Sequence, residues 1–269
     1  MLANGRAQET SGHTRFALVE SRLVSRRAPT HAPREDRGIV TTGSQRSAQE
    51  QFGRMAQSYS NSITHTTRNS LVDLREFVEG RHFKLGVDIG TGPGFTAFTV
   101  APFCDRVIAT DVTPQMLDQV RGLRSQHGAP ETQMALVAAE ALPFKDASVD
   151  LIVTRTASHH FVDLPGWLRE VERVLAPGGL LVNGDTCAPE DLSAAAWMHD
   201  IELRRDSSHI RNLAPSQWKT AVEGAGLRVT EIAMSYVILQ YPDWAERAGM
   251  SESGSAEMRR DLLKAPEAA

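Results

Sequence analysis

The stretch Leu85-Gly86-Val87-Asp88-Ile89-Gly90-Thr91-Gly92-Pro93-Gly94-Phe95-Thr96 determines how the rest of the sequence is interpreted. Its apolar residues lead into three glycines spaced by two, and Phe95 then begins an apolar pattern with helical spacing. This order predicts a strand, a glycine-rich turn and a helix. Glycine lets the backbone adopt positive φ and approach a ligand, and the start of a helix presents free N–H groups. The turn is typical of nucleotide-like ligand sites, and a tight turn without a ligand is the alternative.

An acid further along the chain favours the ligand. Residues 106–112 predict a second apolar strand that ends at Asp111. Its offset of about twenty residues from the turn is where folds of this kind place the carboxylate that binds both ribose hydroxyls. The dinucleotide-binding fingerprint Gly-x-Gly-x-x-Gly requires its third glycine at position 95, where this chain has Phe95. The glycine spacing therefore differs from that fingerprint.

Composition limits the class of protein. The 269 residues, 41% of them hydrophobic, suit one large domain or two small ones. A formal net charge of −4 without a long basic cluster argues against a nucleic-acid partner. Cys104 and Cys187 match no metal-ligand spacing, so we expect no metal and a reducing, cytoplasmic setting. No run of eighteen apolar residues predicts a membrane span.

Residues 1–44 differ from the rest of the chain. They are rich in Arg, Ser, Thr, Pro and Gly and hold only short apolar pieces, so we expect a disordered extension before a domain over residues 45–269. An organelle transit peptide is the alternative, which the acids Glu9, Glu20, Glu35 and Asp36 disfavour.

Short strands and helices alternate after the second strand. Strands are predicted near 134–138, 149–153 and 179–185, and helices begin near Pro114 and Asp163. This alternation predicts an α/β fold with a parallel, doubly wound sheet that binds ligands at the carboxyl ends of its strands. Polar or glycine residues fall at those ends: Gly90, Asp111, Glu140, Arg155 and Asp185.

From about Phe52 onward the chain resembles the type 11 group of class I methyltransferases, which use S-adenosyl-L-methionine (SAM) and are relatives of ubiquinone/menaquinone C-methyltransferases. The segments that carry the resemblance are 88–94, 139–144, 159–161, 170–179 and 188–191. The resemblance implies a Rossmann-like sheet of seven strands whose last strands are antiparallel. We expect two of these strands within the tail, residues 227–241.

The resemblance also implies a SAM site. The three glycines line the amino-acid end of SAM, Asp111 binds the ribose and Val112 packs on the adenine. Many relatives have an aspartate where this chain has Ala138, so the adenine contact is expected from Ala139 or Glu140. The full set of expected cofactor-binding residues is Tyr59, Asp88, Gly90, Gly92, Gly94, Asp111, Val112, Ala139, Glu140 and Arg155.

Two segments are expected to cover the site as lids, residues 45–80 and 187–214. Tyr59 would place its ring against the sulfonium of SAM, as a cation–π contact. A packed helix-cap tyrosine is the alternative. The candidate substrate residues are His65, Asp185, His209 and Arg211, although charge-rich segments are usually solvated surface.

Methyl transfer needs a base only when the acceptor must lose a proton. His159 and His160 are the catalytic candidates, and an adjacent structural pair is the alternative. Residues 155–158, Arg-Thr-Ala-Ser, lack the proline-rich run of enzymes that methylate amide or base nitrogens. We therefore expect a small-molecule acceptor, with O, C and N nucleophiles all open. A non-catalytic SAM-binding or scaffold protein is the other function considered.

Overall fold

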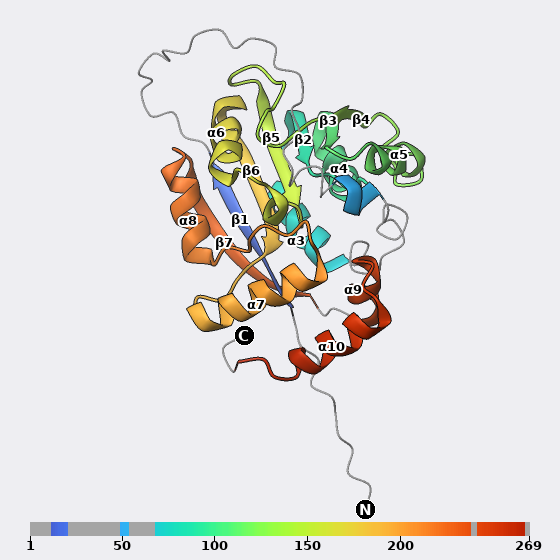
Figure 1. The fold of residues 1–269 in the computed structure, drawn as a ribbon. Coiled ribbons are helices and arrows are strands. Elements are labelled where there is room, and N and C mark those ends of the chain that lie inside the picture. The colour runs from blue at the N-terminus through green and yellow to red at the C-terminus, as the bar shows by residue number, and fades with distance from the viewer. Residues whose placement is uncertain (1–11, 21–48, 54–67, 238–240, 267–269) are drawn as a thin grey trace, which may run out of the picture.

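The computed structural model describes residues 12–20, 49–53, 68–237 and 241–266. Five parallel strands form the body of one sheet, in the order β4-β3-β2-β5-β6 (Figure 1). The buried, apolar β2 lies at the centre of these five strands. The strands are β2 (Phe83–Ile89), β3 (Cys104–Asp111), β4 (Gln133–Leu136), β5 (Val149–Arg155) and β6 (Leu175–Thr186).

The expectation of a seven-stranded methyltransferase sheet with antiparallel last strands is wrong. The tail contributes one strand, β7 (Arg228–Val237), which pairs with none of the five parallel strands. It pairs with β1 (Gly12–Glu20), which is antiparallel to both β6 and β7, so β7 points the same way as the parallel strands. The strand that reverses direction therefore comes from the N-terminal segment.

The position of β1 also differs from the expectation of a disordered extension. Residues 12–20 fill the edge of β6, where backbone groups of the parallel body would otherwise lack strand partners. The other residues of the 1–44 segment lie outside the described residues. Pairing between distant segments leaves no local mark on composition, which is why the sequence did not predict it.

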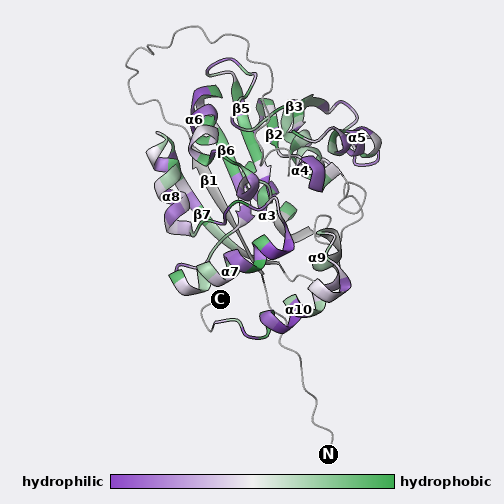
Figure 2. Cartoon of the chain, in the orientation of Figure 1, coloured by the Kyte–Doolittle hydropathy of each residue, from purple (hydrophilic) through white to green (hydrophobic). Residues whose placement is uncertain are grey.

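Helices cover both faces of the sheet. One face carries α3 (Arg68–Val78), α4 (Phe95–Val100) and α5 (Pro114–Leu123), and the other carries α6 (Leu164–Val174) and α8 (Pro215–Gly224). Figure 2 shows the hydrophobic residues concentrated on β2, β5 and β6 between these layers. The strands are apolar over most of their length because both of their faces are covered.

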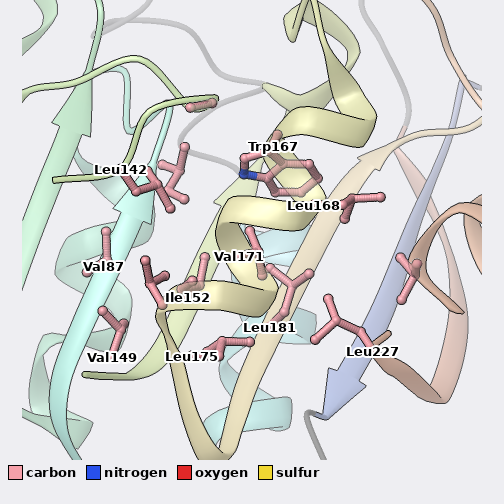
Figure 3. Close-up of a cluster of buried hydrophobic side chains, with 14 of the residues drawn as sticks. Val87, Leu142, Val149, Ile152, Trp167, Leu168, Val171, Leu175, Leu181 and Leu227 are labelled. Atoms are coloured by element: carbon pink, nitrogen blue, oxygen red, sulfur yellow. The ribbon is translucent and has the colours of Figure 1, made fainter. Parts of the chain in front are cut away.

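The helix α6 shows how local sequence sets the core. Asp163 caps its first turn by accepting from the Gly166 N–H at 2.9 Å. Trp167, Leu168 and Val171 then recur at helical spacing and are almost fully buried against β2, β5 and β6 (Figure 3). The helix ends at Val174, and β6 begins at Leu175 rather than near residue 179.

Three more helices gather at one end of the sheet (Figure 1): α7 (Leu192–Arg205), α9 (Tyr241–Arg247) and α10 (Glu252–Leu262). They share a small core of Ile201, Trp244 and Met258. Residues 49–53 are also helical. In the described part of the chain, no helix is both long and apolar enough to span a bilayer.

Candidate active site

A cavity, called the main cavity below, opens at the carboxyl ends of β2, β3 and β5. Its empty volume is about 910 Å³, which includes space open to solvent. The residues that line it are Phe52, Ile89, Gly90, Thr91, Gly92, Pro93, Phe95, Thr96, Asp111, Val112, Met116, Val137, Ala139, Glu140, Arg155, Thr156, Ala157, His160 and Phe161.

The three glycines of the turn have different roles. All have positive φ, at 66° for Gly90, 53° for Gly92 and 99° for Gly94. A Cβ at Gly90 would lie 2.6 Å from the Cβ of Ala157, and one at Gly94 would lie 2.6 Å from the ring of Phe98. A Cβ at Gly92 would meet no protein atom within 4 Å. Gly90 and Gly94 are therefore needed for packing, whereas Gly92 borders open space of the main cavity.

The carboxylate of Asp111 lies at the rim of this space. Oδ2 accepts from the Gly92 N–H at 2.9 Å, and Oδ1 accepts from the Thr113 N–H at 2.9 Å. Burial raises the pKa of Asp111, and these two N–H groups oppose that effect. Asp111 lines the main cavity, and each carboxylate oxygen can accept more than one hydrogen bond. Asp111 can thus bind a pair of ligand hydroxyls without losing its backbone contacts.

Beneath the turn lies a buried acid, Asp88. Its Oδ2 accepts from the Thr91 hydroxyl at 2.6 Å. Burial raises the pKa of Asp88 to about 7, despite the opposing hydrogen bond from Thr91 and the charge of Arg155. Arg155 itself donates from Nε to the Thr96 hydroxyl at 3.1 Å and lines the main cavity. Burial lowers its pKa to about 10, so Arg155 supplies a positive charge at neutral pH.

The buried Asp88 predicts a pH dependence of stability. Its raised pKa means that the folded chain binds a proton that the unfolded chain releases above about pH 4. Its contribution to stability is therefore present below that pH and is lost as pH rises toward 7. Asp88→Asn cannot ionise and should remove this loss. Urea unfolding of the parent and of Asp88→Asn from pH 5 to pH 8 measures the difference.

The expected slope difference is at most about 1.4 kcal/mol per pH unit. Asp105→Asn is the control, because Asp105 is an exposed acid paired with His82. Parallel stability profiles for the parent and Asp88→Asn would mean that Asp88 is ionised throughout this range.

One residue of the cavity wall is strained. Thr156 follows β5 with a φ of 51°, which is unfavourable for a β-branched residue. Its N–H donates to the Gly184 carbonyl at 2.8 Å, which holds the segment in place. Such strain costs of the order of 1–3 kcal/mol and is often found where function requires a particular backbone course.

Thr156→Gly should therefore stabilise the protein, by about 1 kcal/mol after the entropy cost of glycine is subtracted. Thr156→Ala is the matched control, because alanine removes the side chain and keeps the unfavourable φ. Urea unfolding compares the two. A glycine variant that is no more stable than the alanine variant would show that the positive φ at this position is not strained.

His159 and Asp185 form a buried pair beside the main cavity. Nδ1 of His159 lies 2.6 Å from Oδ1 of Asp185, and the His159 backbone N–H donates to Oδ2 at 2.8 Å. The Ser158 hydroxyl donates to the same carboxylate. Burial lowers the pKa of His159, but the charge of Asp185 outweighs it and the net shift is upward. In Asp185, burial raises the pKa, and the charge of His159 makes the net shift downward.

His160 is the histidine that faces the main cavity. Its Nδ1 lies 3.0 Å from the carbonyl oxygen of Ser208, which can only accept, so Nδ1 carries the proton. Burial and the neighbouring charge of His159 lower the pKa of His160 to about 3. The ring is therefore neutral at physiological pH, and Nε2 is a hydrogen-bond acceptor. The edge of Phe52 packs on this ring, with the centroids 4.9 Å apart.

The loop of residues 206–211 lies across these histidines. Two of its backbone N–H groups donate to the His159 carbonyl, at 2.9 and 3.1 Å. His209 is 2% exposed, and its ring lies 5.5 Å from the rings of both His159 and His199. Burial and then the charge of His159 lower its pKa to about 4. Among the described residues, no group of three or more His, Cys, Asp or Glu side chains could hold a metal ion.

The structure brings most of the predicted site residues together. Eight line the main cavity: Gly90, Gly92, Asp111, Val112, Ala139, Glu140, Arg155 and His160. Asp88 lies beneath the turn and Gly94 caps α4 rather than lining the main cavity. Asp185, His159 and His209 form the neighbouring cluster, whereas Arg211 lines a different cavity. Tyr59 and His65 lie outside the described residues.

Sequence reasoning missed several lining residues. Thr156 and Ala157 directly follow a predicted strand end, so the rule that ligands bind at strand ends could have found them. Phe52 belongs to the predicted lid segment 45–80 but was not singled out, and Met116 comes from a helix that gave no site signal. The Gln49 side chain donates to the Val112 carbonyl at 2.7 Å and places residues 49–53 at the cavity.

A model of the methyltransferase domain matches residues 87–183. The chain is 33% identical over 163 residues to an uncharacterized methyltransferase, YcgJ of Bacillus subtilis, covering 61% of this chain and 64% of YcgJ. It therefore spans just under two thirds of that relative. The uncharacterized protein YafE of Escherichia coli is 32% identical over 164 residues, which cover 61% of this chain and 79% of YafE.

The crystal structure of YcgJ superposes with a TM-score of 0.65 at 30% identity, covering 74% of this chain and 85% of YcgJ. The resemblance inferred from the sequence motifs is confirmed. With a family model, relatives above 30% identity and a solved structure in agreement, the chain belongs to the methyltransferase domain family and has its class I fold.

Proposed function

We propose that the chain binds SAM in the main cavity and transfers its methyl group to a small-molecule acceptor. The observation that carries the proposal is the pairing of Gly92 with Asp111. The glycine leaves open space beside the backbone, and the Asp111 carboxylate at its edge can accept further hydrogen bonds. A ribose with two adjacent hydroxyls fits this arrangement.

The remaining cofactor contacts follow from the cavity wall. Arg155 is a buried cation beside the turn and suits the carboxylate of the methionine moiety. Val112 and Ala139 offer apolar surface for the adenine. Glu140 accepts from the Val162 N–H at 3.0 Å, which ties this wall to the start of α6. Its carboxylate is therefore shared between the cavity and the backbone.

Methyl transfer is a displacement at the methyl carbon. The acceptor's lone pair forms the new bond, the carbon–sulfur bond breaks, and its electron pair stays on sulfur in S-adenosylhomocysteine. SAM supplies the activated methyl group, and the protein aligns the acceptor and excludes water. Nε2 of His160 can accept a hydrogen bond from an acceptor O–H or N–H in the main cavity. His159 packs against His160 and pairs with Asp185, and neither residue lines the main cavity, so both would act as positioning residues.

Two segments would enclose the ligands. The helix of residues 49–53 places Phe52 on the main cavity, and Gln51 donates to the Ala248 carbonyl at 2.9 Å. The loop of residues 206–211 covers the histidines from the other side. These contacts support the proposed lid roles of the segments 45–80 and 187–214.

Calorimetric titration with SAM and with S-adenosylhomocysteine tests the proposal. Both should bind with dissociation constants in the micromolar range. S-adenosylhomocysteine should then form when SAM and a mixture of small cell metabolites are added together. Absence of heat with either ligand would favour the other candidate, a scaffold that keeps the fold without binding SAM. Binding without turnover of any metabolite would favour a non-catalytic SAM-binding protein.

A further inference from the structure

A second cavity lies between α6 and α8, which are neighbours on the same face of the sheet (Figure 1). Its empty volume, which includes space open to solvent, is about 1200 Å³. Phe161 lines both this cavity and the main cavity, so the two are separated there by one aromatic side chain.

The wall of the second cavity is largely apolar. Most of its surface residues are aliphatic or aromatic: Phe161, Val162, Leu164, Pro165, Ile210, Leu213, Trp218 and Ala221. A cavity of this composition favours a ligand with a hydrocarbon or aromatic body, because burial of apolar area is favourable.

The charge of the second cavity is positive. Arg211 is its only charged lining residue, and its exposed side chain makes no hydrogen bond or ion pair within the part of the chain that the structure describes. Two acids that adjoin the lining residues have other partners. Asp163 caps α6 and pairs with Arg169, and Glu190 accepts from the N–H and hydroxyl of Ser216. An anionic group is therefore the complementary partner for Arg211.

A buried donor supplies a second, independent indication. Trp218 lines the same cavity and is 4% exposed, yet its indole N–H has no hydrogen-bond partner among the described residues. An unsatisfied buried N–H is unfavourable, and an acceptor atom of a ligand would satisfy it once the indole, whose nitrogen is closed to solvent in this structure, turned toward the cavity. The donor and the cation both favour a ligand that carries an acceptor or negatively charged oxygen.

We propose that the second cavity anchors the methyl acceptor and that this acceptor is an amphipathic organic anion, a carboxylate with an apolar chain or ring. The acceptor role rests on the proposed function. The anion would lie at Arg211 and the apolar body along α6 and α8. The end of the molecule that becomes methylated would extend past Phe161 into the main cavity.

Octanoate and 1-octanol are suitable calorimetric probes, because they share an apolar chain and differ in charge. Octanoate should bind the full-length protein at least tenfold more tightly than octanol. Arg211→Gln should weaken octanoate binding about tenfold and leave octanol unchanged. Arg169→Gln is the matched control, because Arg169 is an exposed arginine on α6 that does not line the second cavity. Equal affinities for the two probes, or equal octanoate affinity in the parent and Arg211→Gln, would overturn the proposal.

A second variant tests the buried donor. Trp218→Phe keeps an aromatic wall and removes the N–H, so it should weaken octanoate binding by about threefold or more. If the folded Trp218→Phe protein binds octanoate with parental affinity, the indole N–H does not contribute to the proposed site.

Repeating the octanoate titration with saturating S-adenosylhomocysteine tests the acceptor role. Two ligands that share the Phe161 wall should alter each other's affinity by at least threefold. Unchanged affinity would show that the second cavity is not the acceptor site. Failure of the proposed function is distinguishable, since it would appear as absence of SAM binding in protein that still binds octanoate.

Discussion

Gly92→Val is expected to abolish SAM binding, with a dissociation constant raised more than a hundredfold. A Cβ at this position meets no protein atom within 4 Å, so the new side chain would occupy the open space of the main cavity. The φ of 53° also strains a branched residue, at a cost of about 1–2 kcal/mol, which a folded domain can tolerate. Calorimetry with SAM measures the loss, and circular dichroism verifies the fold.

Gly128→Val is the matched control. Gly128 has a φ of 70° and likewise no protein atom within 4 Å of an added Cβ, but it lies in the turn after α5 and does not line the main cavity. This variant should carry the same backbone strain and bind SAM like the parent. If Gly92→Val also retains parental affinity, the space beside Gly92 is not used by the cofactor.

Asp111→Ala should raise the dissociation constant of SAM by about ten- to a hundredfold. Charge-assisted hydrogen bonds to the two ribose hydroxyls would be lost, and each is worth about 1.5–3 kcal/mol when the alternative is an unpaired group. Since 1.4 kcal/mol corresponds to a factor of ten, part of this energy is enough for the predicted change. Loss of the Gly92 and Thr113 contacts should also loosen the turn.

Asp105→Ala is the control for this variant. Asp105 belongs to the same strand, β3, but lies at its other end as an exposed partner of His82. It should leave SAM affinity unchanged. Equal affinity of the Asp111→Ala protein and the parent would show that β3 does not end at the ribose, and the proposed placement of the cofactor would be wrong.

The sequence predicted the parallel core because the relevant signals are local. The apolar run before Gly90, the acid at Asp111 and the spacing of Trp167, Leu168 and Val171 each reflect contacts within one strand, turn or helix. Strand ends that point the same way must meet at one edge of the sheet. The assembly of Gly90, Gly92, Asp111 and Arg155 around one cavity therefore followed from patterns of a few residues each.

The tertiary structure alone determined which strand pairs at the edge of the sheet and which of two adjacent histidines lines the main cavity. The short apolar pieces near the N-terminus predicted no strand, because β1 is defined by its distant partners β6 and β7. His159 and His160 are adjacent in sequence, yet one pairs with Asp185 and the other lines the main cavity. The sequence predicted a methyltransferase with a glycine turn and a ribose-binding acid. The orientation of each histidine and the presence of Arg211 and Trp218 in the wall of one second cavity depend on packing between segments far apart in the chain. Local periodicity carries no information about such contacts.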